Sequence, residues 1–104
     1  MVMSVEKTPI QDILLLRADI FQDYRGFYTE VYRKDKFRES GLPDMFVQLN
    51  HFGSAKNVLR GLHFQWDPPM GKLMRVTRGK AFLVVVDIRK WSPPGSLFEN
   101  GIDQ

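Results

Sequence analysis

Cysteine is absent from this chain of 104 residues. Its absence excludes disulfide bonds and thiolate metal sites, and nothing in the sequence points to secretion. Long apolar runs are also missing, and no basic-then-apolar leader precedes an A-x-A cleavage pattern. We therefore expect neither a membrane span nor a signal peptide, and predict a cytoplasmic protein.

Charge of one sign is not concentrated in any part of the chain. The net charge is +3, and the arginines and lysines are scattered rather than gathered in a block. Because nucleic-acid-binding domains usually carry a clustered basic face, we expect no nucleic-acid partner. A few convergent arginines would still suit a small phosphorylated ligand, since a guanidinium group binds phosphate through two hydrogen bonds.

Turn-forming residues separate short runs of β-branched and aromatic residues, with 8 glycines and 6 prolines in the chain. This pattern favours many short strands over helices. We predict a turn at 23–26, a short helix at 34–40 that Gly41 and Pro43 stop, and a loop at 67–71. The segment 91–95 is turn-rich, and 96–104 shows no pattern. The predicted strands are 13–16, 27–33, 45–52, 58–66, 72–77 and 80–88, of which 13–16 is expected to be buried. Strand alternation in 45–52 would place Gln48 and Asn50 on one face, and 72–77 is expected to pair with 80–88 around Arg78-Gly79.

These segments predict a single all-β domain over residues 1–104. About six strands are fewer than the eight of a complete jelly roll. A partly built barrel exposes a strand edge, and an exposed edge invites pairing with a second chain. We therefore expect a dimer.

The most informative segment reads LRGLHFQ from residue 59 to residue 65. Strand alternation would point His63 and Gln65 to one face, and Leu62 and Phe64 to the other. A half-buried strand with histidine and glutamine on its inner face lines a pocket rather than filling a core. An imidazole there can act as a general base near neutral pH. A lone strand histidine is nevertheless more often structural than catalytic.

Several ordered motifs together resemble the dTDP-4-dehydrorhamnose 3,5-epimerase family, a cupin-fold group of deoxysugar nucleotide biosynthesis. Each motif is weak alone, but the set follows the family's order and nearly its spacing. The resemblance is strongest over residues 10–94 and leaves a divergent tail at 95–104. The motifs are Phe21-x-Asp23-x-Arg25-Gly26-Phe27-x-x-Glu30, Gln48-x-Asn50, the segment 59–65, Gly71-Lys72-Leu73, Gly79, and Val86-Asp87-Ile88-Arg89-x-x-Ser92-Pro93.

The resemblance implies an all-β cupin or jelly roll (a double-stranded β-helix), in an incomplete or short version that forms a homodimer. It implies an isomerase that epimerises C3 and/or C5 of a dTDP-4-keto-6-deoxyhexose in rhamnose-type biosynthesis. Such chemistry needs a base for the α-proton, an electrophile for the enolate oxygen and an acid on the opposite face.

The resemblance also implies roles for individual residues. His63 matches the base, and Lys72 matches the positive charge near the enolate oxygen. Without the motif, Lys72 would be an ordinary solvated strand lysine. The residues implied to bind substrate are Phe21, Arg25, Glu30, Gln48, Asn50 and Arg60.

Alternative interpretations stay open for several of these residues. Gln48 could be a surface polar residue, and 23–26 could be a plain charged turn. In the family the segment around Arg25 reaches into the neighbouring subunit's pocket, where Arg25 would meet phosphate. There Phe21 could stack on thymine or pack in the dimer interface. For Phe27 we favour packing in the dimer interface.

No metal and no cofactor are expected. Metal-binding cupins carry a His-x-His pair, but Gln65 stands at the second position, and His51 is the only other histidine. Two histidines far apart in sequence make a poor metal site. The related sugar 3,4-ketoisomerases also carry a second histidine there, so Gln65 argues against that activity.

The resemblance breaks down in the last part of the sequence. The family's later segment supplies further strands, a tyrosine acid and an aspartate that orients the base. Here the tyrosines are Tyr24, Tyr28 and Tyr32, and neither Asp87 nor Asp103 stands at the orienting position. Three explanations remain: a shortened chain, a partner that supplies the missing groups, or a catalytically silent sugar-nucleotide-binding or assembly module.

Overall fold

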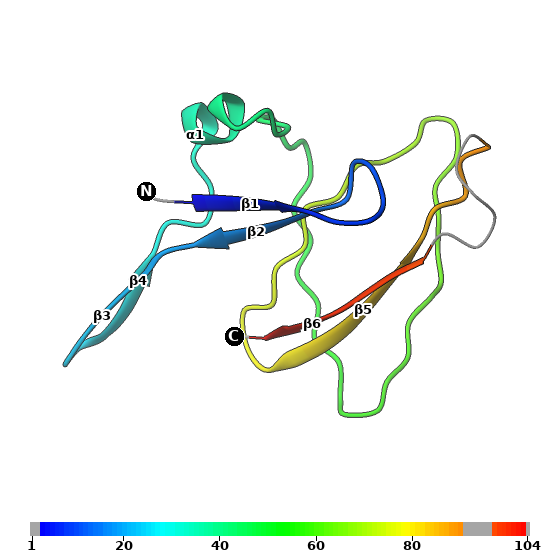
Figure 1. Cartoon of the computed structure of the whole chain (residues 1–104). Helices are drawn as coiled ribbons and strands as arrows, with labels where there is room; N and C mark the ends of the chain where they lie inside the picture. Colours follow the sequence, from blue (N-terminus) through cyan, green and yellow to red (C-terminus); the bar gives the residue numbers. More distant parts are fainter. Residues whose placement is uncertain (1–2, 91–96, 104) are drawn as a thin grey trace.

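The computed structural model describes residues 3–90 and, for the backbone, residues 97–103. Within these ranges the regular elements are six strands and a single short helix (Figure 1). This agrees with the predicted all-β class. In chain order the elements are β1 (Met3–Lys7), β2 (Leu14–Ala18), β3 (Ile20–Asp23), β4 (Gly26–Thr29), α1 (Lys34–Glu39), β5 (Lys80–Val86) and β6 (Leu97–Asp103).

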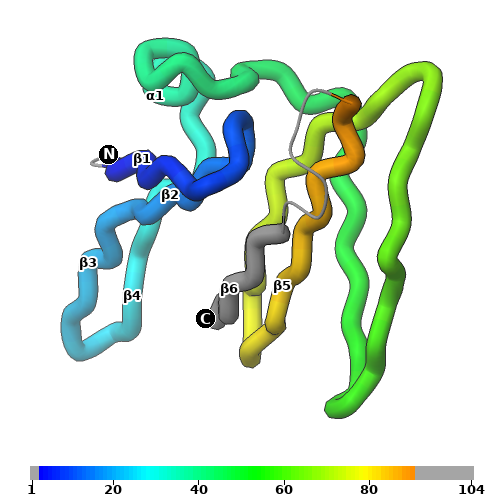
Figure 2. The backbone as a smooth tube through the Cα atoms, turned by 45° about the vertical axis from the view of Figure 1, so that its right-hand side comes forward, coloured from blue at the N-terminus to red at the C-terminus, as the bar shows by residue number. Residues whose placement is uncertain are grey.

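The described strands pair as three antiparallel hairpins. Met3 of β1 pairs with Ala18 of β2, Ile20 of β3 pairs with Thr29 of β4, and β5 pairs with β6 along its whole length. Figure 2 shows the first two hairpins on one side of the molecule and β5 on the other. No hydrogen-bonded ladder joins one hairpin to another in the described part of the chain.

The predicted turn at 23–26 is confirmed. Asp23 pairs with Gly26, so Tyr24 and Arg25 form a two-residue hairpin loop. Gly26 has φ +133°, a conformation that residues with a Cβ rarely adopt. The following strand is shorter than the predicted 27–33, because β4 ends at Thr29.

The predicted helix is also confirmed, with its stop signal. After Ser40 the chain turns through Gly41 at φ +74°, and two hydrogen bonds close the end: Gly41 N–H to Arg38 O at 3.1 Å and Leu42 N–H to Phe37 O at 2.9 Å. This is a Schellman motif, in which a left-handed glycine lets the last carbonyls find donors. Leu42 and Phe37, the apolar pair that accompanies such a motif, are both buried.

The core around α1 is small. Phe37 is 1% exposed, and its ring meets Tyr32 edge-on at a centroid distance of 4.9 Å. Phe46 packs edge-on against both rings. Among the residues whose burial is described, the buried apolar side chains are Ile10, Phe37 and Leu42.

Three predicted strands are not strands in this structure: 45–52, 58–66 and 72–77. Their sequences have strand-like alternation, but a strand also needs a hydrogen-bonded neighbour, and no described segment pairs with them. Residues 45–66 run out to a turn at Ala55–Val58 and return, as the green part of the tube in Figure 2 shows. Val58 N–H closes this turn on Ala55 O at 3.3 Å.

The strand that pairs with β5 is not the predicted one. Strand β5 falls within the predicted 80–88, but it pairs with β6 rather than with 72–77. The tail at 96–104 was expected to be unpatterned, yet β6 covers most of it. Glycine, asparagine and aspartate disfavour strands on average, so only the pairing with β5 explains β6. The predicted turn at 91–95 lies outside the described residues.

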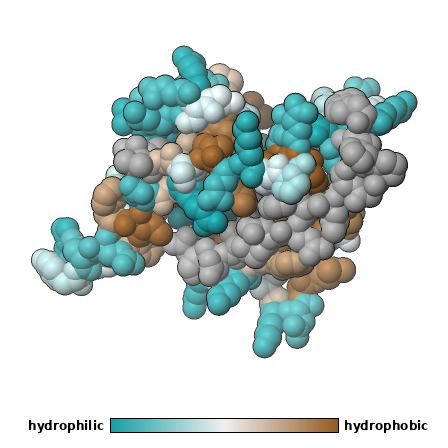
Figure 3. Space-filling view, in the orientation of Figure 1, coloured by the Kyte–Doolittle hydropathy of each residue, from teal (hydrophilic) through white to brown (hydrophobic). Residues whose placement is uncertain are grey.

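The described surface is unusually apolar. Large side chains such as Val47, Leu49 and Trp66 are exposed, and so is Leu14 at the start of β2, where a buried strand was expected. Hydrophobic residues, coloured brown, appear at several places on the face drawn in Figure 3. The single described helix, six residues long, is far too short to cross a bilayer.

Candidate functional site

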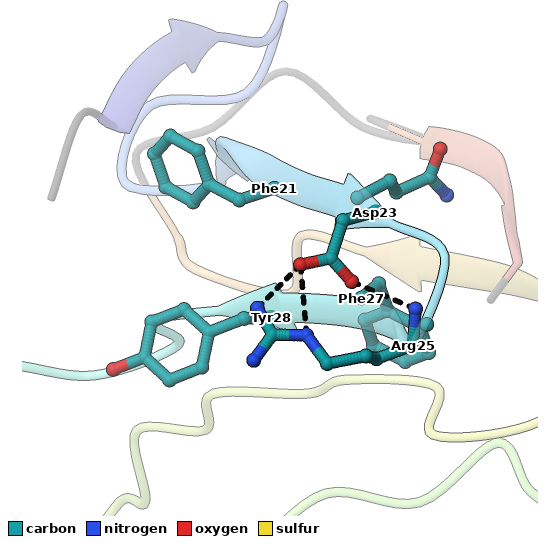
Figure 4. A pocket seen from close by; sticks show the side chains of 7 residues that line it. Phe21, Asp23, Arg25, Phe27 and Tyr28 are labelled. Carbon is teal, nitrogen blue, oxygen red and sulfur yellow. Dashed lines mark hydrogen bonds and ion pairs between the residues drawn. The ribbon is translucent and has the colours of Figure 1, made fainter.

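The β3–β4 hairpin forms a pocket of about 410 Å³ from its own side chains. Within the hairpin, Phe21 pairs with Tyr28 and Gln22 pairs with Phe27. Two predicted substrate-binding residues, Phe21 and Arg25, therefore lie at one pocket, with Asp23 between them in Figure 4. The lining residues are Phe21, Gln22, Asp23, Arg25, Gly26, Phe27 and Tyr28.

Arg25 is held by Asp23 in this pocket. The Arg25 backbone N–H donates to Asp23 Oδ1 at 2.8 Å, and Nε donates to Oδ2 at 3.0 Å (Figure 4). The guanidinium Nη2 also donates to Oδ2. The side-chain hydrogen bond from Arg25 lowers the pKa of Asp23, so the pair is ionic at neutral pH. Arg25 is thus oriented at an open, aromatic-walled pocket.

Gln48 and Asn50 lie together, as predicted. Gln48 Nε2 donates to Asn50 Oδ1 at 3.1 Å. The two side chains therefore share one side of the extended chain, although residues 45–52 are not in a strand. Both are exposed, so the remaining hydrogen-bonding atoms of the two amides are open to a ligand.

His63 is exposed, and its ring lies over the backbone of Gly61. A Cβ on Gly61 would stand 3.3 Å from His63 N and 3.5 Å from His63 Nδ1. Gly61 also has φ +96°, which disfavours any residue with a side chain. Among the described residues, no hydrogen bond or ion pair holds the imidazole. The site therefore contains no described carboxylate that orients His63.

Gln65, the other polar residue of this segment, has a partner of its own. Its Nε2 donates to Pro68 O at 3.0 Å, in the loop predicted at 67–71. The glutamine thus braces the proline-containing loop. It occupies the position where a metal-binding cupin would have its second histidine.

Arg60 is positioned by the turn that precedes it. Its Nε donates to Ser54 Oγ at 2.8 Å, its Nη2 donates to Gly53 O at 3.1 Å, and its guanidinium lies 5.0 Å from the centre of the Phe52 ring. A guanidinium placed by two hydrogen bonds and an aromatic face is partly preorganised for an anion.

The remaining predicted residues are Lys72 and Glu30. Lys72 is exposed and forms no ion pair with a described residue. Glu30 is partly buried just after β4. No hydrogen bond links His63 to Lys72 among the described residues, so the structure does not join the two predicted catalytic side chains directly.

One polar cluster was not predicted from the sequence. Arg89 donates to Asp87 Oδ1 through Nε at 2.9 Å and to Asp12 Oδ2 through Nη1 at 2.7 Å. Asp87 is 6% exposed in this pair. Asp87 and Arg89 both stand in one of the family motifs, but no pattern in the sequence predicted their contact with each other or with Asp12.

No group of three or more histidine, aspartate or glutamate side chains within the described ranges is placed to hold a metal ion.

Comparison with known proteins supports the family resemblance. A family model described as dTDP-4-dehydrorhamnose 3,5-epimerase matches residues 7–98. The chain is 52% identical over 93 residues to the dTDP-4-dehydrorhamnose 3,5-epimerase of Salmonella typhimurium, covering 88% of this chain and 51% of that protein. It is 46% identical over 92 residues to the protein of the same name from Pseudomonas aeruginosa, with coverage of 88% and 51%.

A solved structure gives the same relationship in three dimensions. The crystal structure of dTDP-4-dehydrorhamnose 3,5-epimerase from Elizabethkingia anophelis superposes with a TM-score of 0.77 at 34% identity, covering 97% of this chain and 57% of that one. The chain thus spans about half the length of the relatives it matches. From the extent of the family match, the level of identity and the shared fold, we conclude that the chain belongs to the dTDP-4-dehydrorhamnose 3,5-epimerase family.

Proposed function

We propose that this chain takes part in the epimerisation of a dTDP-4-keto-6-deoxyhexose at C3 and/or C5, in rhamnose-type deoxysugar biosynthesis. The observation that carries this proposal is the family match over residues 7–98, which includes the motif of His63 and that of Lys72. The relatives are named for the 3,5-epimerase reaction.

The chemistry follows from the ketone at C4. A proton on C3 or C5 is acidic because its removal leaves an enolate whose charge rests on the C4 oxygen. His63 removes this proton as a neutral imidazole, and the ammonium group of Lys72 stabilises the enolate oxygen. Reprotonation from the opposite face completes the inversion and needs an acid on that face.

Binding falls to the other polar and aromatic residues of the proposed site. We assign the diphosphate and sugar to Arg60, Gln48 and Asn50. Arg25 binds the phosphate, and Phe21 and Glu30 belong to the same proposed substrate-binding site. Two observations support these assignments: Arg60 is braced by Ser54 and Gly53, and Arg25 is oriented at the aromatic hairpin pocket.

The remaining parts of the proposal concern fold and assembly. We propose one cupin or jelly-roll domain over residues 1–104, in a short version, which acts as a cytoplasmic homodimer. The reaction as written needs no cofactor and no metal, because the substrate ketone is itself the electron sink.

A second candidate is a catalytically silent sugar-nucleotide-binding or assembly module. Two observations favour it. No described carboxylate orients His63, and Tyr32, one of the three tyrosines, donates its hydroxyl to Asp44 O beside the small core. A base without an orienting group binds substrate but turns it over poorly.

One experiment distinguishes the two candidates. The chain is incubated with dTDP-4-keto-6-deoxyglucose in D2O, and the sugar is followed by proton NMR. Deuterium at C3 or C5 supports the epimerase and identifies the carbon. Binding of dTDP without deuterium incorporation supports the silent module, and neither binding nor exchange contradicts both.

Binding is assigned to the site by paired variants. We expect Arg60→Gln and Arg25→Gln to weaken dTDP binding in calorimetry, because each removes a cation that the proposal places at phosphate. Arg78→Gln is the matched control, since Arg78 is also exposed but lies outside the proposed site. Equal weakening in all three variants would mean that only overall charge attracts the nucleotide.

A further inference from the structure

Arg60 is held along one edge of its guanidinium group, and the other edge is open. Nε donates to Ser54 Oγ at 2.8 Å, and Nη2 donates to Gly53 O at 3.1 Å. A guanidinium carries five N–H groups, so three remain, two on Nη1 and one on Nη2. None of the three has an acceptor among the described residues. The open edge, formed by Nη1 and Nη2, can bind two oxygens of a phosphate at once.

The turn at Ala55–Val58 makes this arrangement possible. A backbone hydrogen bond of 3.3 Å closes the turn, so the chain doubles back in the green part of the tube in Figure 2. Arg60 thereby returns beside residues 52–54, and its guanidinium lies 5.0 Å from the centre of the Phe52 ring. An aromatic face attracts a guanidinium. Ser54 therefore fixes one edge of the group, and Phe52 fixes one face.

The groups that hold Arg60 leave its positive charge uncancelled. They are a hydroxyl, a backbone carbonyl and an aromatic ring, none of which carries a charge. Arg25 differs, because its Nε and Nη2 both donate to the carboxylate of Asp23. Arg89 differs further, because two carboxylates accept hydrogen bonds from its guanidinium. Of these three arginines, Arg60 is the one that combines an uncancelled charge with an open edge.

We propose that Ser54 and Phe52 are positioning residues of a phosphate site: they hold Arg60 so that Nη1 and Nη2 meet the diphosphate of a sugar nucleotide. The class of ligand rests on the proposed function. Ser54 and Phe52 act through Arg60, because a cation that is already oriented loses less side-chain freedom when the phosphate binds. Arg60 also contributes more to binding than Arg25 does, since Asp23 cancels the charge of Arg25.

Calorimetric titration of the full chain with dTDP tests the serine. Ser54→Ala removes the acceptor of Nε and should weaken binding about threefold to tenfold, as expected for one exposed hydrogen bond. Ser54→Thr keeps a hydroxyl and should restore most of the affinity. Ser4→Ala is the matched control, because Ser4 is exposed on β1 and its side chain has no described partner. Unchanged binding in Ser54→Ala, or an equal loss in Ser4→Ala, would overturn the proposal.

A double-mutant cycle separates positioning from a general effect on the turn. Arg60→Met keeps a long side chain but has no N–H group to donate. In that background, Ser54→Ala should weaken dTDP binding no further, because the group that Ser54 positions is gone. Phe52→Leu should weaken binding about twofold to fivefold in the unsubstituted chain, and not at all beside Arg60→Met. Losses of the same size in both backgrounds would show that the two residues do not act through Arg60, and the proposal would be wrong.

The NMR signal of the Arg60 Nε–H tests the geometry without any ligand. In Ser54→Ala this signal should shift, and its exchange with water should become faster, because its acceptor is lost. In Ser4→Ala it should stay the same. An Arg60 Nε–H signal that Ser54→Ala leaves unchanged would overturn the proposal.

These readouts distinguish the inference from the proposed catalysis. Binding of dTDP that depends on Ser54, without deuterium at C3 or C5 of the sugar, would support the phosphate site and contradict the epimerase. Deuterium incorporation, with dTDP binding that Ser54→Ala leaves unchanged, would support the epimerase and overturn the positioning role. Absence of dTDP binding by the unsubstituted chain would also overturn the phosphate site.

Discussion

Arg89 and Asp12 are joined by a hydrogen bond of 2.7 Å although 77 positions separate them in the sequence. Arg89 Nη2 also donates to Gln11 O at 2.8 Å and to Asp87 Oδ2 at 2.9 Å. These contacts fix the loop between β1 and β2 against the residues that follow β5. Two parts of the molecule that share no ladder are thereby held together.

We predict that Arg89→Gln lowers the midpoint of thermal unfolding clearly more than Arg17→Gln does. Arg89 is 28% exposed and serves three partners, one of them the nearly buried carboxylate of Asp87. Arg17 forms a single pair with Glu6, at 2.8 Å on the open face of the first hairpin, where ion pairs contribute little. Equal midpoints for the two variants, measured by differential scanning calorimetry, would contradict this account.

Gly41→Ala should destabilise the chain by about 1–2 kcal/mol, because alanine must adopt the left-handed conformation at φ +74° that ends α1. Space is not the cause, since no atom lies within 4 Å of an added Cβ. Urea unfolding measures the change. Gly53→Ala is the control, because Gly53 is equally open and its backbone is not left-handed. A loss of the same size at Gly53 would contradict the assignment to backbone conformation.

The pKa of Asp23 should lie below its ordinary value of 3.8, because Arg25 donates hydrogen bonds to the ionised carboxylate. A carboxylate with a lowered folded pKa stabilises the hairpin above pH 3.8, and this stabilisation is lost as the pH falls through the folded pKa. NMR titration of the Asp23 carboxyl carbon measures this pKa.

Arg25→Gln should raise the pKa of Asp23 part of the way back, since the backbone N–H of residue 25 still donates. Arg78→Gln should leave the Asp23 titration unchanged. An unchanged Asp23 titration in the Arg25 variant would show that the ion pair does not form in solution.

Gly61→Ala should lower proton exchange from the substrate by about tenfold to hundredfold, if His63 is the base, because a misplaced base loses reach. An added Cβ would stand 3.3 Å from the backbone N of His63, which is a tight contact, and 3.5 Å from Nδ1, which is an ordinary one. Gly61 also has φ +96°, so alanine would strain the backbone beside His63. The imidazole NMR signals of His63 should shift in the same variant. A folding defect elsewhere in the chain would not shift the signals of His63 alone. Unshifted signals would show that Gly61 does not position the ring.

Local signals in the sequence predicted the local structure well. The two-residue turn before Gly26 and the end of α1 at Gly41 were both predicted, because each depends on the conformation that a glycine allows within a few residues. Gln48 and Asn50 were predicted to share a face, and their hydrogen bond confirms it.

Pairing between distant segments could not be predicted in the same way. Residues 45–52 and 58–66 alternate like strands, but alternation does not supply a neighbour, and no described segment provides one. Strand β6 contains Asn100 and Gly101, which disfavour strands, and exists through its register with β5. The contact of Arg89 with Asp12 crosses most of the chain and leaves no local signal.

In the proposed reaction, His63 removes a proton from the carbon beside the C4 ketone. The most direct test compares His63→Ala with His51→Ala in the deuterium exchange assay, with protein stability checked for both. Substitution of His63 should abolish deuterium incorporation at C3 and C5, while substitution of the chain's other histidine leaves it unchanged. Incorporation by the His63 variant at the rate of the unsubstituted chain would remove His63 from the mechanism.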